Sequence, residues 1–145
     1  MRVLSKKSFD EYRAILDGLE EKSVRGFAKK ARPLAVAFMN APSEDERSIY
    51  RSAITDDVYG RVDLMCAQAQ ACADDMFVAM IGEEAAPHEA MPYEKADARV
   101  RSAAVHVFND GDVDEFVRVL DTFIRLEVRA AASSAMADNV EEANR

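Results

Sequence analysis

The stretch VYGRVDLMCAQAQACADDMFVAM, residues 58–80, carries the pattern that decides the fold. Its apolar side chains recur at steps of three or four residues: Val58, Val62, Met65, Ala69, Cys72, Met76 and Met80. This spacing places them on one face of a helix and is typical of a bundle or coiled-coil seam. Gly82 then interrupts the pattern, so the sequence predicts a long core helix over about 58–81.

A second long core helix is predicted over about 112–136, after the turn Asn109-Asp110-Gly111. Asp112 and Glu115 form a helix-capping pattern at its start. Its apolar side chains cover an arc of about 200°, so this helix is central in the bundle or also buried in a dimer. We expect its remaining face to be solvated; that face carries Asp114, Arg118, Asp121, Arg125 and Arg129.

Shorter helices are predicted in the rest of the chain. Capping boxes at Ser8 and Ser43 begin two of them, the second ending near Thr55, and another covers about 93–108. Pro33 either kinks a helix or opens a new one, and the apolar run Leu34 to Met39 is assigned to a helix because no partner strand is evident. The predicted fold is an all-α, compact bundle of five to six helices.

Length and composition indicate one domain. The chain has 145 residues, 49% of them hydrophobic, and no repeat or Gly/Ser linker divides it. We expect a single helical bundle over residues 1–137, followed by a polar, frayed tail over 138–145.

Nothing in the sequence indicates a membrane or secreted protein. The longest stretch without charged residues, Pro33 to Ser43, is far shorter than the roughly 20 residues that span a bilayer. Met1 to Phe9 is not followed by an apolar block of signal-peptide length. Cys66 and Cys72 are six residues apart on one predicted helix and cannot bridge within it, so we expect two free thiols and a cytoplasmic location.

Charge is distributed unevenly along the chain. The net charge is -8, but residues 1–40 carry nine basic and five acidic side chains, whereas residues 41–92 carry three and eleven. The basic part places Lys22, Arg25, Lys29 and Arg32 on one face if it is helical. The acidic part supplies Asp56, Asp57, Asp63, Asp74, Glu83 and Glu84. We predict that this basic stripe and this acidic face bind partners.

Direct nucleic-acid binding is not expected. A helix-turn-helix can be considered over residues 47–65, but its second helix would begin with Asp56 and Asp57 and would also carry Asp63. A recognition helix presents basic or amide side chains near its start, and these carboxylates would instead repel phosphates.

No metal, cofactor or catalytic motif stands out. Residues 110–115 are rich in Asp but do not match the glycine turn of a calcium-binding loop. His88 lies in a Pro-bounded loop near Glu84 and Glu89, a weak donor set. Both cysteines fall on or beside the apolar seam. We therefore expect no cofactor, no metal and no catalytic residue.

Glu127 is the one carboxylate that falls inside an apolar arc. It projects between apolar neighbours on the second long helix, where a carboxylate needs a cation or a proton. Arg61 or Arg99 could pair with it, and we take Glu127 with Arg61 as the candidate buried polar pair. Three roles are open for this pair: a structural ion pair, part of a ligand pocket, or a polar contact that fixes the register of a dimer.

The function expected from these features is a non-catalytic protein–protein interaction module, an adaptor or regulator that forms a homodimer. The first alternative is an acidic inhibitor of a nucleic-acid-binding protein, of the anti-CRISPR or DNA-mimic type, from a mobile element. That idea rests on charge and size alone. The second alternative is an enzyme or small-ligand binder without a recognisable motif.

Overall fold

A computed structural model describes residues 6–145, and this part of the chain is entirely helical apart from its turns and loops. The helices are α1 (Lys6–Ser23), α2 (Phe27–Asn40), α3 (Glu44–Ile81), α4 (Tyr93–Asp110) and α5 (Val113–Ala143). No strand occurs among them. The all-α prediction is confirmed for the described residues; the first five residues of the expected domain lie outside them.

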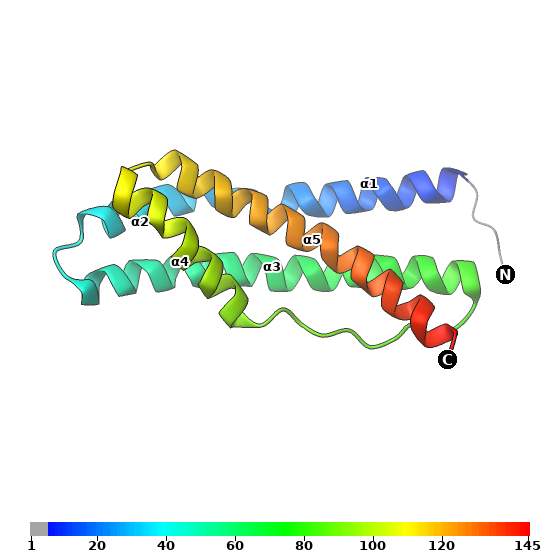
Figure 1. Ribbon diagram of the computed structural model, residues 1–145. Helices are drawn as coiled ribbons and strands as arrows, with labels where there is room; N and C mark the ends of the chain where they lie inside the picture. Colours follow the sequence, from blue (N-terminus) through cyan, green and yellow to red (C-terminus); the bar gives the residue numbers. More distant parts are fainter. Residues whose placement is uncertain (1–5) are drawn as a thin grey trace.

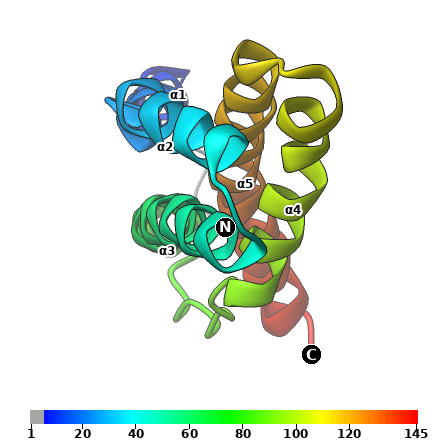
Figure 2. The same cartoon turned by 90° about the vertical axis from the view of Figure 1, so that its left-hand side faces the viewer.

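The helices make four rods instead of the five or six that the sequence predicted. α1 and α2 lie end to end along one side of the molecule (Figure 1). Figure 2 looks along this arm and shows α1 and α2 nearly superimposed, with α3 beneath them and α4 and α5 beside them. We call α1 and α2 together the α1/α2 arm. Pro33 stands inside α2, and Leu34 to Met39 are helical as predicted.

α3 is one continuous helix, so the prediction of a separate helix ending near Thr55 is wrong. Its expected ends are confirmed: the Ser43 side chain accepts a hydrogen bond from the Glu46 backbone N–H, and Gly82 follows in a left-handed conformation with φ of 82°. The hydroxyl of Thr55 donates to the Arg51 carbonyl at 3.1 Å, within the helix. Thr55 therefore satisfies its polar group without ending the helix.

α5 is the central helix. It contacts each of the other four helices, and its contact with α3 is the most extensive in the molecule. Its buried side chains include Phe116, Leu120, Ile124 and Val128, each of which stabilises the fold by roughly 1.5–3 kcal/mol. The wide apolar arc is thus covered within one chain, apart from Leu126, which is 62% exposed.

The C-terminal part of α5 belongs to the bundle, so the prediction of a frayed tail from residue 138 is wrong. α5 extends to Ala143, and Asn139 is buried. The Asn139 side-chain amide donates to Asp74 at 2.7 Å and accepts from the backbone N–H of Ala86 at 2.7 Å. These bonds fasten the end of α5 to α3 and to the loop that follows α3.

The polar face of α5 contacts the α1/α2 arm instead of being solvated as a whole. Arg125 pairs with Glu21 at 2.7 Å and with Asp121 at 2.8 Å, and Arg129 pairs with both Asp17 and Glu20. Asp114 pairs with Arg32 of α2. Charged residues of α5 and of the arm, which are far apart in the sequence, therefore neutralise one another in part.

Candidate interaction groove

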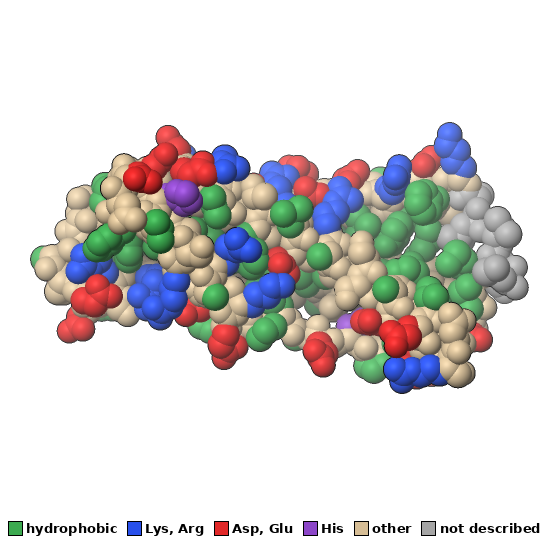
Figure 3. Space-filling view, in the orientation of Figure 1, with side chains coloured by type: hydrophobic (Ala, Val, Ile, Leu, Met, Phe, Trp, Pro, Cys, Tyr) green, Lys and Arg blue, Asp and Glu red, His purple; other side chains and the backbone are tan. Residues whose placement is uncertain are grey.

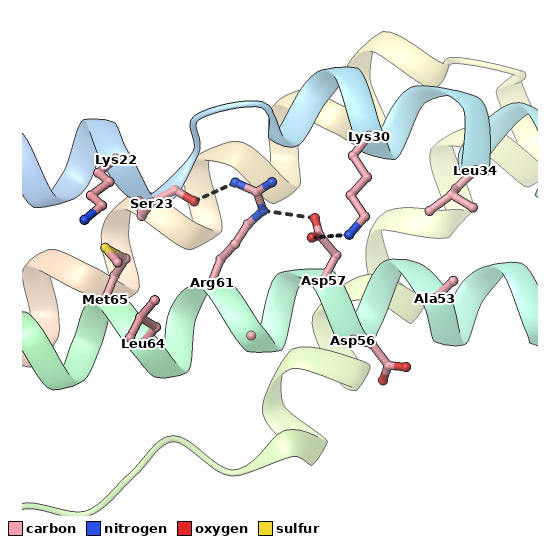
Figure 4. Close-up of a pocket in the computed structure, with 11 residues that line it drawn as sticks. Lys22, Ser23, Lys30, Leu34, Ala53, Asp56, Asp57, Arg61, Leu64 and Met65 are labelled. Atoms are coloured by element: carbon pink, nitrogen blue, oxygen red, sulfur yellow. Dashed lines mark hydrogen bonds and ion pairs between the residues drawn. The ribbon is translucent and has the colours of Figure 1, made fainter.

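A groove of about 750 Å³ lies between the α1/α2 arm and α3. The arm contributes Lys22, Ser23, Lys30 and Leu34, and α3 contributes Ala53, Asp56, Asp57, Gly60, Arg61, Leu64 and Met65. Figure 4 shows most of these side chains between the arm and α3, with Asp56 directed away from the arm. Four of the candidate residues predicted from the sequence, Lys22, Asp56, Asp57 and Arg61, meet here.

The groove begins where the arm is broken. Gly26 has φ of 74°, a left-handed conformation that separates α1 from α2. A helix end leaves carbonyl oxygens without intrahelical donors. The Arg61 guanidinium supplies the missing donors: it donates to the carbonyl of Ser23 at 3.2 Å and to that of Arg25 at 2.7 Å. Arg61 therefore holds the break in the arm against α3.

Asp57 fixes Arg61 in place. Its carboxylate accepts from Arg61 Nε at 3.0 Å and forms an ion pair with Lys30 Nζ at 3.1 Å, as the dashed lines in Figure 4 show. The side chain of Asp57 is only 11% exposed, and Arg61 also lies over the Phe27 ring, 5.6 Å from its centroid. We call Arg61, Asp57 and Lys30 the clamp. It joins the arm to α3 and gives the groove a fixed shape.

The floor of the groove is lined by apolar and small side chains. Leu34 and Met65 lie against the core, and Leu64 is 56% exposed. Ala53 and Gly60 are seven residues apart on α3 and so lie on nearly the same face. No heavy atom lies within 4 Å of the point where a Cβ on Gly60 would stand. A Cβ at this position would therefore stand in open space.

The arm side of the groove carries Lys22 and Lys30, whereas the α3 side carries both signs of charge. Lys22 extends from the arm and forms no ion pair within residues 6–145. Asp56 points from α3 away from the arm, toward α4, and accepts a hydrogen bond from the Tyr93 hydroxyl at 2.7 Å. That hydrogen bond to Asp56 raises the pKa of Tyr93 to about 12. Tyr93 in turn packs edge-on against Tyr59.

The predicted basic stripe is not a single helix face. α1 ends at Ser23, so Lys22 and Lys29 stand on different helices, and Arg25 lies in the turn between them. Lys29 is exposed, whereas Arg32 pairs with Asp114. The stripe requires a continuous helix, and the left-handed Gly26 removes that continuity.

The predicted acidic face is also divided. Asp56 and Asp57 line the groove, and Asp63 is exposed on α3. Asp74 lies near the end of α3, where it accepts from Asn139 and contacts His88 Nε2 at 2.7 Å. Glu83 and Glu84 are exposed after α3 ends.

The predicted pair of Glu127 with Arg61 is wrong. Glu127 pairs with Lys95 of α4 at 3.0 Å, and Arg99 instead lies over the Phe123 ring. Beside Glu127, the thiol of Cys66 donates to the Glu127 carbonyl at 3.5 Å. Burial raises the pKa of this thiol to about 11, so Cys66 is not an activated nucleophile.

Sequence reasoning missed the roles of Lys30, Gly60, Leu64 and His88. His88 is not in an exposed acidic loop with Glu84 and Glu89: its side chain is 8% exposed and contacts Asp74 and Asp138. A step of seven residues between the small side chains Ala53 and Gly60 was the available signal for the groove. Nothing in the sequence indicated which carbonyls Arg61 would bind.

The groove is suited to binding more than to chemistry. The clamp satisfies its own charges, and no histidine or cysteine lines this groove. Across residues 6–145, no three His, Cys, Asp or Glu side chains are grouped so that they could hold a metal ion. Within the same residues, no helix is long and apolar enough to cross a membrane.

No family model, curated protein or solved structure matches this chain.

Proposed function

We propose that this protein is a non-catalytic protein-binding module, an adaptor or regulator, whose groove receives an amphipathic helix of a partner protein. Helix-in-groove recognition places an apolar helix face into a groove with an apolar floor and polar edges. The observation that carries the proposal is the uncovered floor of Leu64, Gly60 and Leu34 beside a clamp that keeps the groove open.

The charges at the groove favour one kind of partner helix. Lys22 is available on the arm side, whereas Asp56 points away from the arm and is bound by the Tyr93 hydroxyl. A helix that presents an acidic residue toward Lys22 matches the charge of the arm side. Such rim charges set orientation and association rate more than affinity, which comes from the apolar floor.

The experiment compares Gly60→Trp with Gly18→Trp as bait for the host lysate. Both glycines are helical, and at neither would an added Cβ have a heavy atom within 4 Å, but only Gly60 lines the groove. We expect the wild type and Gly18→Trp to retain the same partner at high salt, and Gly60→Trp to lose it. Retention by all three baits would contradict the proposal.

The homodimer remains a prediction. α5 is covered by the other helices of its own chain, so its wide apolar arc does not require a second copy. Light scattering across micromolar concentrations measures the mass directly. If the mass is that of a dimer and Gly60→Trp alone restores the monomer, the occupant of the groove is a second copy instead of a different protein.

The acidic-inhibitor alternative draws less support from the charge arrangement. Asp57 and Asp74, two members of the proposed acidic face, bind side chains of their own chain. Asp63, Glu83 and Glu84 remain exposed for a polyanion mimic. A captured partner that is basic, binds nucleic acid and dissociates at high salt would favour this alternative.

We also propose a cytoplasmic location. Cys66 and Cys72 are both free, which suits a reducing compartment. Fractionation of host cells with an antibody against the protein tests this, and recovery outside the cytoplasm would contradict it.

A further inference from the structure

A second pocket, distinct from the groove, lies between the first turns of α3 and the end of α4. It has a volume of about 270 Å³. Three arginines line it, Arg47 and Arg51 from α3 and Arg101 from α4, together with the aromatic ring of Phe108. Figure 3 shows basic and acidic side chains next to one another at this end of the molecule, on its left-hand side.

The cationic charge of this pocket exceeds the carboxylate charge that faces it. Glu44 is the only carboxylate that lines the pocket, and it pairs with Arg47 at 3.2 Å. Arg101 pairs with Asp97 outside the lining, at 2.8 Å. Arg51 forms no ion pair with any residue of the described chain; its guanidinium donates one hydrogen bond, to the Ser48 hydroxyl at 3.4 Å, and lies near enough to Tyr93 to interact with it electrostatically.

One donor in the pocket lacks an acceptor. The Nε atom of Arg51 is buried and has no hydrogen-bond partner in residues 6–145, whereas the buried Nε atom of Arg47 lies 3.2 Å from a carboxylate oxygen of Glu44. A buried N–H without an acceptor is unfavourable, and most such groups in folded proteins are satisfied. The Arg51 guanidinium thus has a donor without a protein acceptor, and an oxyanion bound in the pocket would supply one.

The pocket also has an apolar edge. Phe108 is 61% exposed and Val105 is 50% exposed, and the Arg47 guanidinium lies 5.2 Å from the Phe108 ring centroid. Large apolar side chains held beside a cationic pocket fit a ligand that carries an anionic group on a flat apolar body. Guanidinium groups bind phosphate oxygens in a bidentate manner.

We propose that Arg47, Arg51 and Arg101 form a binding site for an aryl phosphate monoester. The phosphate would accept from the guanidinium groups, and the aromatic body would lie along Phe108 and Val105. This site shares no lining residue with the groove and does not depend on the proposed function.

The test is an NMR titration of the arginine Nε–Hε signals with phenyl phosphate. We expect saturable shifts at Arg47 and Arg51 at millimolar ligand, no shift at the control Arg13 of α1, and weaker binding of inorganic phosphate. Phenol, which lacks the anion, should produce no shift. Absence of saturable shifts at Arg47 and Arg51 would overturn the proposal, and equal binding of inorganic phosphate would overturn its aromatic part.

Matched variants provide a second measurement. Arg51→Gln should weaken phenyl phosphate binding by about tenfold, since it removes a charge-assisted contact. Arg13→Gln removes the same charge from a surface arginine that stacks on Phe9 and should leave binding unchanged. Circular dichroism confirms that both variants fold. Equal affinity of Arg51→Gln and wild type would overturn the assignment.

Discussion

Arg61 and Arg51 stand ten residues apart on the same helix and occupy opposite situations. Arg61 donates to Asp57 and to the carbonyls of Ser23 and Arg25. Arg51 has a buried Nε with no acceptor and no ion pair in the described part of the chain. The same residue type therefore fastens the fold at one place and is available for a ligand at the other. The number of acceptors around a guanidinium, more than its charge, distinguishes the two roles.

The largest expected difference between Arg61 and Arg51 is in their contribution to the free energy of unfolding. Arg61→Ala should lower the free energy of unfolding by about 2–3 kcal/mol, because it leaves two carbonyls and the nearly buried Asp57 with fewer donors. Arg51→Ala should change it by no more than about 0.5 kcal/mol. Urea unfolding of both variants measures the difference. Equal losses would remove the distinction between the two arginines.

The glycines around the clamp provide the next contrast. Gly60→Ala should raise the free energy of unfolding by about 0.5–1 kcal/mol, since Gly60 is helical and a Cβ there meets open space. Gly26→Ala should lower it by about 1 kcal/mol, because Gly26 has a positive φ. Thermal unfolding measures both. A loss of stability in Gly60→Ala would show that the groove floor is closed.

Removing the partly exposed ion pairs of Arg129 should have a smaller effect on stability. Arg129 is 40% exposed and pairs with Asp17 and Glu20 of α1. Arg129→Gln should lower the free energy of unfolding by about 0.5–1 kcal/mol at low salt, and less at about 1 M salt, where such pairs are screened. A loss that does not change with salt would indicate packing and not charge.

The smallest expected effect is the titration of Tyr93. The hydrogen bond to Asp56 raises the pKa of Tyr93 to about 12, above its value in the unfolded chain. The resulting stabilisation is fully present below about pH 10 and is lost as the pH rises from about 10 to 12. Ultraviolet titration should show a tyrosine that ionises near pH 12 and disappears in Tyr93→Phe. Ionisation of all four tyrosines near pH 10 would contradict the contact with Asp56.

Local signals predicted much of the fold. Ser43 and Gly82 mark the two ends of α3, and the apolar spacing correctly places Val58, Val62, Met65 and Ala69 in the core. Farther along α3 the buried side chains are Ala73 and Phe77 instead of the predicted Cys72, Met76 and Met80. The same local reasoning failed at Thr55, because a capping residue can also satisfy its hydroxyl within a helix. It failed again at Asn139, whose polar side chain is buried only because Asp74 and the backbone of Ala86 are close in space.

The candidate site was less accessible to prediction. The sequence pattern indicated Lys22, Asp56, Asp57 and Arg61, but as members of separate surfaces or of a pair with Glu127. Arg61 binds the carbonyls of Ser23 and Arg25, which become available because Gly26 takes a left-handed conformation. Such contacts depend on the tertiary position of a helix end, which spacing along the chain does not specify.

Photo-crosslinking from the groove tests the central claim most directly. A benzophenone side chain at Leu64, which is 56% exposed in the groove, is compared with one at Leu126, which is 62% exposed on α5 outside it. In the presence of the captured partner, position 64 should crosslink to one amphipathic helix of that partner, and position 126 should not. Crosslinks from position 126 with none from position 64 would contradict the assignment of the groove.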